Sequence, residues 1–173
     1  LTPGTEYVAY AIGLKADGTY TTKAYTYEFK TIDDKKSKVS LSTRMTGTSY
    51  ESVFPGQITF TFFTYSNPQK EAGKLYCKKF QDIDEWAGKT SEEIVTELCK
   101  NDNMSAQAHE WRDYVNWTKP GVQFYIYSIG EDTDGIKTDI LKCSHTGKAS
   151  EVGVNGMPKE VTFDQTETIP VAR

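Results

Sequence analysis

The sequence predicts a mainly β protein: a β-sandwich with a short helical insertion, preceded by the C-terminal part of a second, similar module. Three observations lead to this prediction. The 11 Tyr, the 8 Phe and the abundant Thr favour strands, and the 13 Gly and 6 Pro supply turns. Residues 58–65 (ITFTFFTY) show the clearest strand pattern of the chain. A block of sixteen residues also occurs twice, which indicates a tandem module.

The repeated block is the strongest of these observations. It is PGTEYVAYAIGLKADG at residues 3–18 and PGVQFYIYSIGEDTDG at residues 120–135. Each copy predicts a Pro-Gly corner, a strand, and an Asp-Gly turn in which glycine supplies a positive φ. Because the first copy lies so near Leu1, we expect the chain to open inside a module. The identical pairs are Pro3 and Pro120, Gly4 and Gly121, Tyr10 and Tyr127, Ile12 and Ile129, Gly13 and Gly130, Asp17 and Asp134, and Gly18 and Gly135.

The chain is expected to have four parts. They are the C-terminal part of one module (1–31), a charged linker (32–38), a whole module with its helical insertion near 80–101 (39–147), and a tail or the start of a further strand or module (148–173). Besides the repeated hairpins, strands are predicted at residues 39–44, 49–54, 58–65, 111–117 and 160–163.

Two capping-box patterns interrupt these strands, at residues 82–85 and 90–93. Apolar residues recur at helical spacing after the second pattern, which predicts an amphipathic helix over residues 91–100. A shorter helix, ended by Gly88, is predicted before it.

The second copy of the repeated strand has two apolar faces, because strand side chains alternate. One face carries Tyr125, Tyr127 and Ile129, and the other carries Phe124, Ile126 and Ser128. Both faces should therefore be covered. We expect the facing sheet to cover one of them and the helical insertion, through Trp86 and Leu98, to cover the other.

Residues 1–18 resemble the late strands of a fibronectin type III module, which carry an L-x-P-G-T-x-Y pattern. Leu1, Pro3, Gly4, Thr5 and Tyr7 occupy its positions. The resemblance implies a tyrosine corner, in which the Tyr7 hydroxyl bonds back to upstream backbone. The second copy departs from the pattern, with Trp117, Val122 and Phe124 in place of Leu, Thr and Tyr. Phenylalanine cannot make the corner hydrogen bond, so we expect that corner to depend on packing alone.

A narrower resemblance is to fibronectin-III-like modules of surface lipoproteins of Gram-negative anaerobes. These have a helical segment in mid-domain, then a Y-x-A-Y-A-x-G strand and a D-G turn, a layout that residues 39–147 follow throughout and residues 1–31 follow for its last third. The resemblance implies an extracellular or outer-surface protein, lipid-anchored through a segment outside this chain. Its implied partners are neighbouring modules of the same polypeptide and a host or cell-surface protein or glycan.

Three aromatic residues are the candidates for a ligand site: Tyr125, Tyr127 and Trp117. They could form an exposed platform for sugars, and the alternative is that they belong to the core. Asp132 and Asp134, in a turn that resembles the opening of a calcium loop, are the candidates for a metal site. The equivalent turn of the first copy lacks most of these acids, so the alternative is a solvated turn. Structural roles are expected for Pro3, Gly4, Tyr7, Gly18, Pro120, Gly121, Phe124 and Gly135.

Catalytic patterns are absent from the sequence. His109 and His145 do not lie in a Ser, Cys or Asp motif, although a Cys99–His109 dyad remains an alternative. Cys77, Cys99 and Cys143 have no metal-ligand spacing, and their odd number leaves at least one free thiol, with a Cys77–Cys99 bridge as the alternative. We therefore expect no enzyme activity, no cofactor and no metal.

Charge and hydropathy exclude two further classes of partner. The net charge of −4 argues against nucleic acid, and no apolar run approaches the roughly 20 residues of a membrane span. We predict a non-catalytic surface or secreted module for adhesion, ligand binding or spacing in a larger bacterial protein. The alternatives are a glycan-binding accessory module of a carbohydrate-handling protein, or a fragment of a secreted hydrolase whose catalytic domain lies elsewhere.

Overall fold

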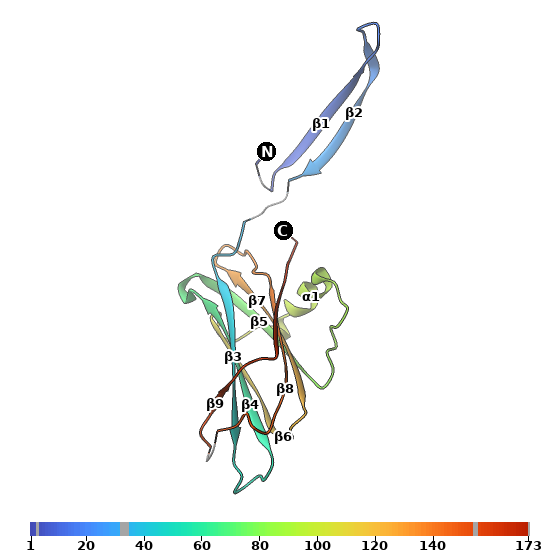
Figure 1. Ribbon diagram of the computed structural model, residues 1–173. Helices are drawn as coiled ribbons and strands as arrows, with labels where there is room; N and C mark the ends of the chain where they lie inside the picture. The colour runs from blue at the N-terminus through green and yellow to red at the C-terminus, as the bar shows by residue number, and fades with distance from the viewer. Residues whose placement is uncertain (3, 32–34, 154–155, 173) are drawn as a thin grey trace. The chain divides into compact units, whose positions relative to one another are not determined.

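The computed structural model of the chain describes residues 1–2, 4–31, 35–153 and 156–172 (Figure 1). These residues are mainly β, with antiparallel sheets and one short α-helix, and they divide into two units, residues 1–35 and 36–172. Pro3 and residues 32–34 of the predicted linker lie outside the described residues.

Unit 1 is a two-stranded hairpin of β1 (Glu6–Leu14) and β2 (Tyr20–Lys30). The Asp17 carboxylate accepts hydrogen bonds from the Thr19 N–H at 2.9 Å and hydroxyl at 2.6 Å, and Gly18 has a φ of +80°, so the predicted Asp-Gly turn is present. The tyrosine-corner hydrogen bond is also present, because the Thr2 N–H donates to the Tyr7 hydroxyl at 2.7 Å.

Unit 2 contains two four-stranded antiparallel sheets, in the orders β6-β4-β3-β9 and β10-β8-β7-β5 (Figure 1). The first is formed by β3 (Ser40–Ser49), β4 (Ile58–Asn67), β6 (Glu110–Thr118) and β9 (Lys159–Val161). The second is formed by β5 (Ala72–Gln81), β7 (Gln123–Asp132), β8 (Ile140–Thr146) and β10 (Gln165–Ile169). Without β9 and β10, one sheet consists of β3, β4 and β6, and the other consists of β5, β7 and β8. This all-β sandwich is compatible with an immunoglobulin-like or fibronectin-III-like module.

The two sheets enclose the main core. Phe60 and Phe62 of β4 meet Phe124 of β7, with both ring centroids 5.1 Å from that of Phe124. A second cluster lies on the outer face of β7, where Trp86 and Leu98 pack with the strand and α1 lies beside it (Figure 1). The prediction that the facing sheet covers one face of β7 and the insertion covers the other is confirmed.

The helix α1 (Ser91–Leu98) begins at a complete capping box. The Thr90 hydroxyl accepts the Glu93 N–H at 3.3 Å, and the Glu93 carboxylate accepts the Thr90 N–H at 2.8 Å. The shorter predicted helix is wrong, because residues 82–83 are bends and residues 85–88 form turns. Asp84 there accepts the Trp86 N–H, and its carboxylate also binds partners on β7 and β8. Two 3-10 turns, η1 (Gln69–Glu71) and η2 (Asn101–Asn103), complete the helical residues.

Two further expectations differ from the structure. The strands predicted at 39–44 and 49–54 are instead one strand, β3, followed by a loop over residues 50–56. Gly47 interrupts the sequence pattern but lies within β3, where a Cβ would come within 2.2 Å of the Glu151 carbonyl oxygen. In the tail, β9 covers part of the predicted strand, and the polar strand β10 was not predicted at all. None of the described helices is long and apolar enough to cross a membrane.

Candidate functional site

Tyr127 is buried, although it was a candidate for ligand contact. Only 1% of the residue is exposed, and its hydroxyl donates to the two Asp84 oxygens, each at 3.0 Å. The Lys142 ammonium lies 2.9 Å from Asp84 and 5.2 Å from the centroid of the Tyr127 ring. Burial raises the pKa of Tyr127 to about 12, so its hydroxyl keeps its proton. This group of three polar side chains anchors the turn at residues 82–88 to β7 and β8.

Tyr125 lies two residues away on the same face of β7, at an open hollow of about 240 Å³. The register places Tyr125 opposite Ser144 of β8, and Ser144 opposite Gln165 of β10. The Tyr125 ring is half-buried, and its hydroxyl donates to the Gln123 side-chain oxygen at 2.8 Å. The hollow therefore offers an aromatic ring with polar groups around it, and its full lining is Gln123, Tyr125, Ser144, His145, Thr146, Asp164 and Gln165.

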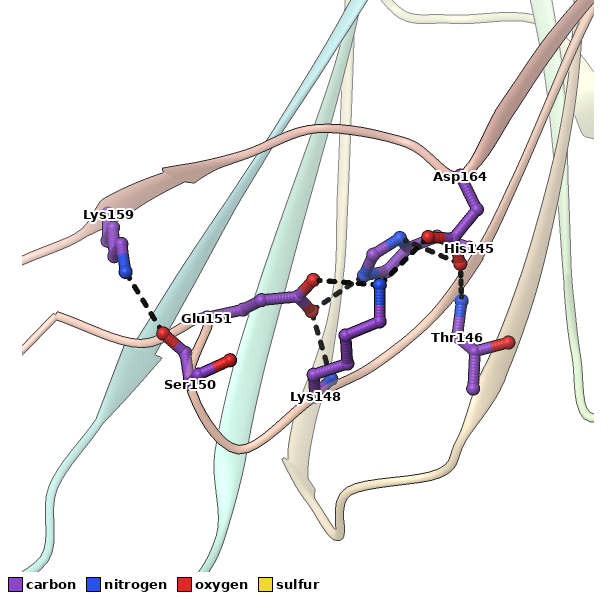
Figure 2. Close-up of polar contacts among 7 residues, drawn as sticks. All are labelled: His145, Thr146, Lys148, Ser150, Glu151, Lys159 and Asp164. Atoms are coloured by element: carbon purple, nitrogen blue, oxygen red, sulfur yellow. Dashed lines mark hydrogen bonds and ion pairs between the residues drawn. The ribbon is translucent and has the colours of Figure 1, made fainter.

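A buried histidine of β8, His145, contributes to the lining of this hollow. Figure 2 shows its polar contacts. The His145 side chain has no exposed surface, and its ring contacts Phe60 at a centroid distance of 6.1 Å. Its Nε2 lies 2.7 Å from a Glu151 oxygen, and its Nδ1 lies 3.3 Å from an Asp164 oxygen. Lys148 approaches both carboxylates, at 3.6 Å from Glu151 and 3.0 Å from Asp164. We name these four residues the His145 cluster.

The His145 cluster holds the tail against β8. Asp164 accepts the Thr146 N–H at 2.8 Å, and Glu151 accepts the Lys148 N–H at 2.9 Å. The hydrogen bond from the Thr146 N–H, followed by that from the Lys148 ammonium, outweighs burial and holds the pKa of Asp164 below its usual range. Both ring nitrogens of His145 thus face carboxylates, an arrangement that positions the chain. The sequence signalled neither Glu151 nor Asp164, because both come from a polar tail without a motif.

Trp117 lies in a different place, at the end of β6. It is 43% exposed, and Phe54 packs against it in a tilted arrangement with a centroid distance of 4.0 Å, while Tyr50 packs edge-on at 6.0 Å. Its φ of +53° lies in the left-handed region, which is uncommon for an aromatic residue. Trp117 and Tyr125 therefore do not form one platform: Trp117 packs with the 50–56 loop, and Tyr125 lines the hollow.

The two acidic candidates for a metal site have protein partners. Asp132 is buried, and its carboxylate accepts the backbone N–H groups of Lys38, Asp134 and Ile136, each at 2.9 Å. Burial alone raises the pKa of Asp132, but these hydrogen bonds outweigh it and the pKa is lowered. Asp134 pairs with the Lys38 ammonium at 2.6 Å. Among the described residues, no group of three or more His, Cys, Asp or Glu is placed to hold a metal ion.

The three cysteines are free thiols. Because Cys77 and Cys99 are both free, the alternative of a Cys77–Cys99 bridge is not present. Cys77 and Cys143 are buried, and Cys99 is half-buried. Burial raises the pKa of Cys77 to about 12, which removes its reactivity as a thiolate. The alternative of a Cys99–His109 dyad finds no support, because the described residues show no hydrogen bond between these two residues. Cys99 is the C-cap of α1, and the backbone carbonyl of His109 accepts the Ser66 N–H.

Comparison of the chain with models of protein families, with curated proteins and with solved structures finds no match. The functional proposal therefore rests on the geometry of the hollow and on the sequence patterns.

Proposed function

We propose that unit 2 is a fibronectin-III-like, non-catalytic module of an extracellular or outer-surface protein, and that it acts in adhesion by binding a ligand at the Tyr125 hollow. The observation that supports this proposal is the hollow itself, an open site of about 240 Å³ where one aromatic ring meets hydroxyl, amide and carboxylate groups. The polar groups beneath it are paired with one another, as expected of a scaffold that positions a binding surface.

A glycan is the ligand class that these groups fit best. The second candidate function is therefore a carbohydrate-binding accessory module of a larger protein. Sugar hydroxyls are both donors and acceptors, and the hollow offers the amides of Gln123 and Gln165, the hydroxyls of Ser144 and Thr146, and the Asp164 carboxylate. The partly exposed Tyr125 ring adds an apolar surface for the C–H groups of a sugar ring. The hollow is open and only about 240 Å³ in volume, so the contact should involve one or two sugar units at the surface of the module.

A glycan array with the full chain tests this proposal. Tyr125→Ala should abolish binding to any saccharide retained by the array, and Trp117→Ala serves as the matched aromatic control because it lies outside the hollow. Release of a cleaved product from a bound glycan would contradict a non-catalytic role. Binding that survives Tyr125→Ala but is lost in Trp117→Ala would move the site to the 50–56 loop.

A further inference from the structure

A second hollow of unit 2 lies beside the start of β6, and we name it the β6 hollow. It has a volume of about 450 Å³ and is lined by residues 104–107 and by Glu110, Trp111 and Arg112. It belongs to the sheet of β3, β4 and β6, whereas the Tyr125 hollow belongs to the sheet of β7, β8 and β10. Its volume lies within the usual range for small-molecule sites.

Hydrogen bonds fix the segment that forms one wall of the β6 hollow. The Ser105 N–H donates to the Leu75 carbonyl of β5 at 2.7 Å. The Ser66 N–H of β4 donates to the His109 carbonyl at 3.0 Å. Within the segment, the Ser105 hydroxyl donates to the Glu110 carbonyl at 2.6 Å. Strands of both sheets therefore hold this wall, as expected of a preformed site.

The β6 hollow carries two opposite charges that are not used in ion pairs. Glu110 and Arg112 lie two residues apart, on the same face of β6, because strand side chains alternate. The ion pairs of the described residues include neither of them. The neighbouring acid, Asp113, is paired with Lys79 at 2.8 Å. The hollow therefore offers one anionic and one cationic side chain to a ligand.

An aromatic ring holds the exposed Arg112 guanidinium in place. Its central carbon lies 5.4 Å from the centroid of Phe63, the β4 residue opposite Arg112 in the sheet. Arg44 of β3 approaches the same ring at 4.8 Å, but its guanidinium is paired with Glu160. Stacking on a ring leaves the N–H groups of a guanidinium at its rim, where they can bind a carboxylate through two parallel hydrogen bonds.

We propose that the β6 hollow binds a free α-amino acid with an apolar side chain. Arg112 binds the α-carboxylate and Glu110 binds the α-ammonium group. The apolar side chain of the ligand lies against Trp111 and against Met104, which is 45% exposed. A ligand with a single charge would leave one charge of the hollow unpaired, so a zwitterion fits better than a simple acid or amine. This site goes beyond the proposed function, which concerns the other sheet.

The probe is L-leucine, added to the full chain and followed by fluorescence and by calorimetry. Trp111 is the one tryptophan among the residues that line the hollow, so its fluorescence should change saturably. Trp111→Phe should remove this change, while calorimetry still detects binding. N-acetyl-leucine lacks the ammonium group and leucinamide lacks the carboxylate. Each should bind about tenfold more weakly than leucine, the scale of one hydrogen bond to a charged group.

Four variants assign the two charges. Arg112→Gln should weaken leucine binding about tenfold and remove the advantage of leucine over leucinamide. Glu110→Gln should remove its advantage over N-acetyl-leucine. Arg44→Gln is the matched control, because Arg44 contacts the same Phe63 ring but lies outside the hollow. Tyr125→Ala should leave leucine binding unchanged, which separates this site from the proposed glycan site. The blocked ligands test the same contacts in the unmodified chain, should a variant fail to fold.

Three results would overturn the proposal. The first is an absence of both heat and fluorescence change at millimolar leucine. The second is equal binding of leucine and N-acetyl-leucinamide, which would mean that the hollow takes an apolar side chain of a peptide. The third is a loss of leucine binding in Arg44→Gln as large as that in Arg112→Gln.

Discussion

The two copies of the repeated block have the same local structure and opposite surroundings. Both form an antiparallel hairpin with equivalent backbone hydrogen bonds at its open end and a glycine at positive φ in its turn. Yet Tyr10 is 75% exposed, whereas its identical counterpart Tyr127 is 1% exposed. The same local sequence therefore gives the same hairpin pairing in both copies, while burial depends on the layers that pack against it.

The corners differ in the same way. Tyr7 closes its corner with a hydrogen bond from the Thr2 N–H, and its ring stacks on Phe29 at 5.9 Å. Phe124, at the same position of the second copy, is fully buried between Phe60 and Phe62. The polar corner suits a strand whose face is open, and the apolar one suits a strand inside a core.

The largest expected effect comes from truncating the counterpart residues Phe124 and Tyr7. Phe124→Ala should lower the free energy of unfolding of unit 2 by about 3–5 kcal/mol, because it leaves a cavity between the sheets. Tyr7→Ala should leave the unfolding of unit 2 unchanged. Urea denaturation followed by tryptophan fluorescence checks both, since Trp86, Trp111 and Trp117 all lie in unit 2. Equal destabilisation by the two variants would mean that the units are energetically coupled.

The two Asp-Gly turns give the next largest effect. Asp132→Ala should destabilise unit 2 by about 1–3 kcal/mol, since it removes the acceptor for three backbone N–H groups. The counterpart is Lys15, and Lys15→Ala should have no effect on the denaturation midpoint of unit 2. Thermal unfolding with and without calcium completes the measurement, and stabilisation by calcium that Asp132→Ala removes would show that Asp132 binds metal in preference to its backbone partners.

Acid should weaken unit 2 through the carboxylates of Asp132 and Asp164. The pKa of each is lower in the folded state, so its stabilisation is present above the unfolded pKa of about 3.9 and is lost as the pH falls through the folded pKa. Asp164 should contribute less than about 1 kcal/mol by this route, because solvent screens this partly exposed carboxylate. Melting temperatures between pH 6 and pH 2 should fall below about pH 4, and Asp164→Asn should flatten that decline.

The smallest effect is expected at the tyrosine corner. Tyr7→Phe removes the acceptor for the Thr2 N–H, so the Thr2 amide should exchange faster with solvent while the rest of the hairpin keeps its rates. Phe124→Tyr should bring no gain unless the fully buried site offers the new hydroxyl an acceptor. An unchanged exchange rate at Thr2 would contradict the corner in solution.

Local chemistry made several elements predictable from sequence. The Thr90 capping box specifies the start of α1, because the bonds it makes lie within four residues. Alternation predicted that β7 is covered on both faces, and Trp86 and Leu98 indeed cover the outer one. At residues 82–85 the same capping pattern failed: Asp82 has a φ of +67°, outside the extended conformation of a helix N-cap, and Asp84 binds Tyr127 and Lys142.

The sequence by itself determined the two hairpins, their turns and the amphipathic helix, since these follow from backbone preferences and short-range periodicity. Only the tertiary structure decided that one copy is enclosed and the other is open, and that β10 joins β8. It alone brought Asp164 beside His145, and Tyr125 and Gln165 to either side of Ser144 at the same hollow, through pairings of strands distant in the chain. Such contacts depend on sheet order, which a linear pattern does not contain, and the Tyr125 hollow belongs to this second group.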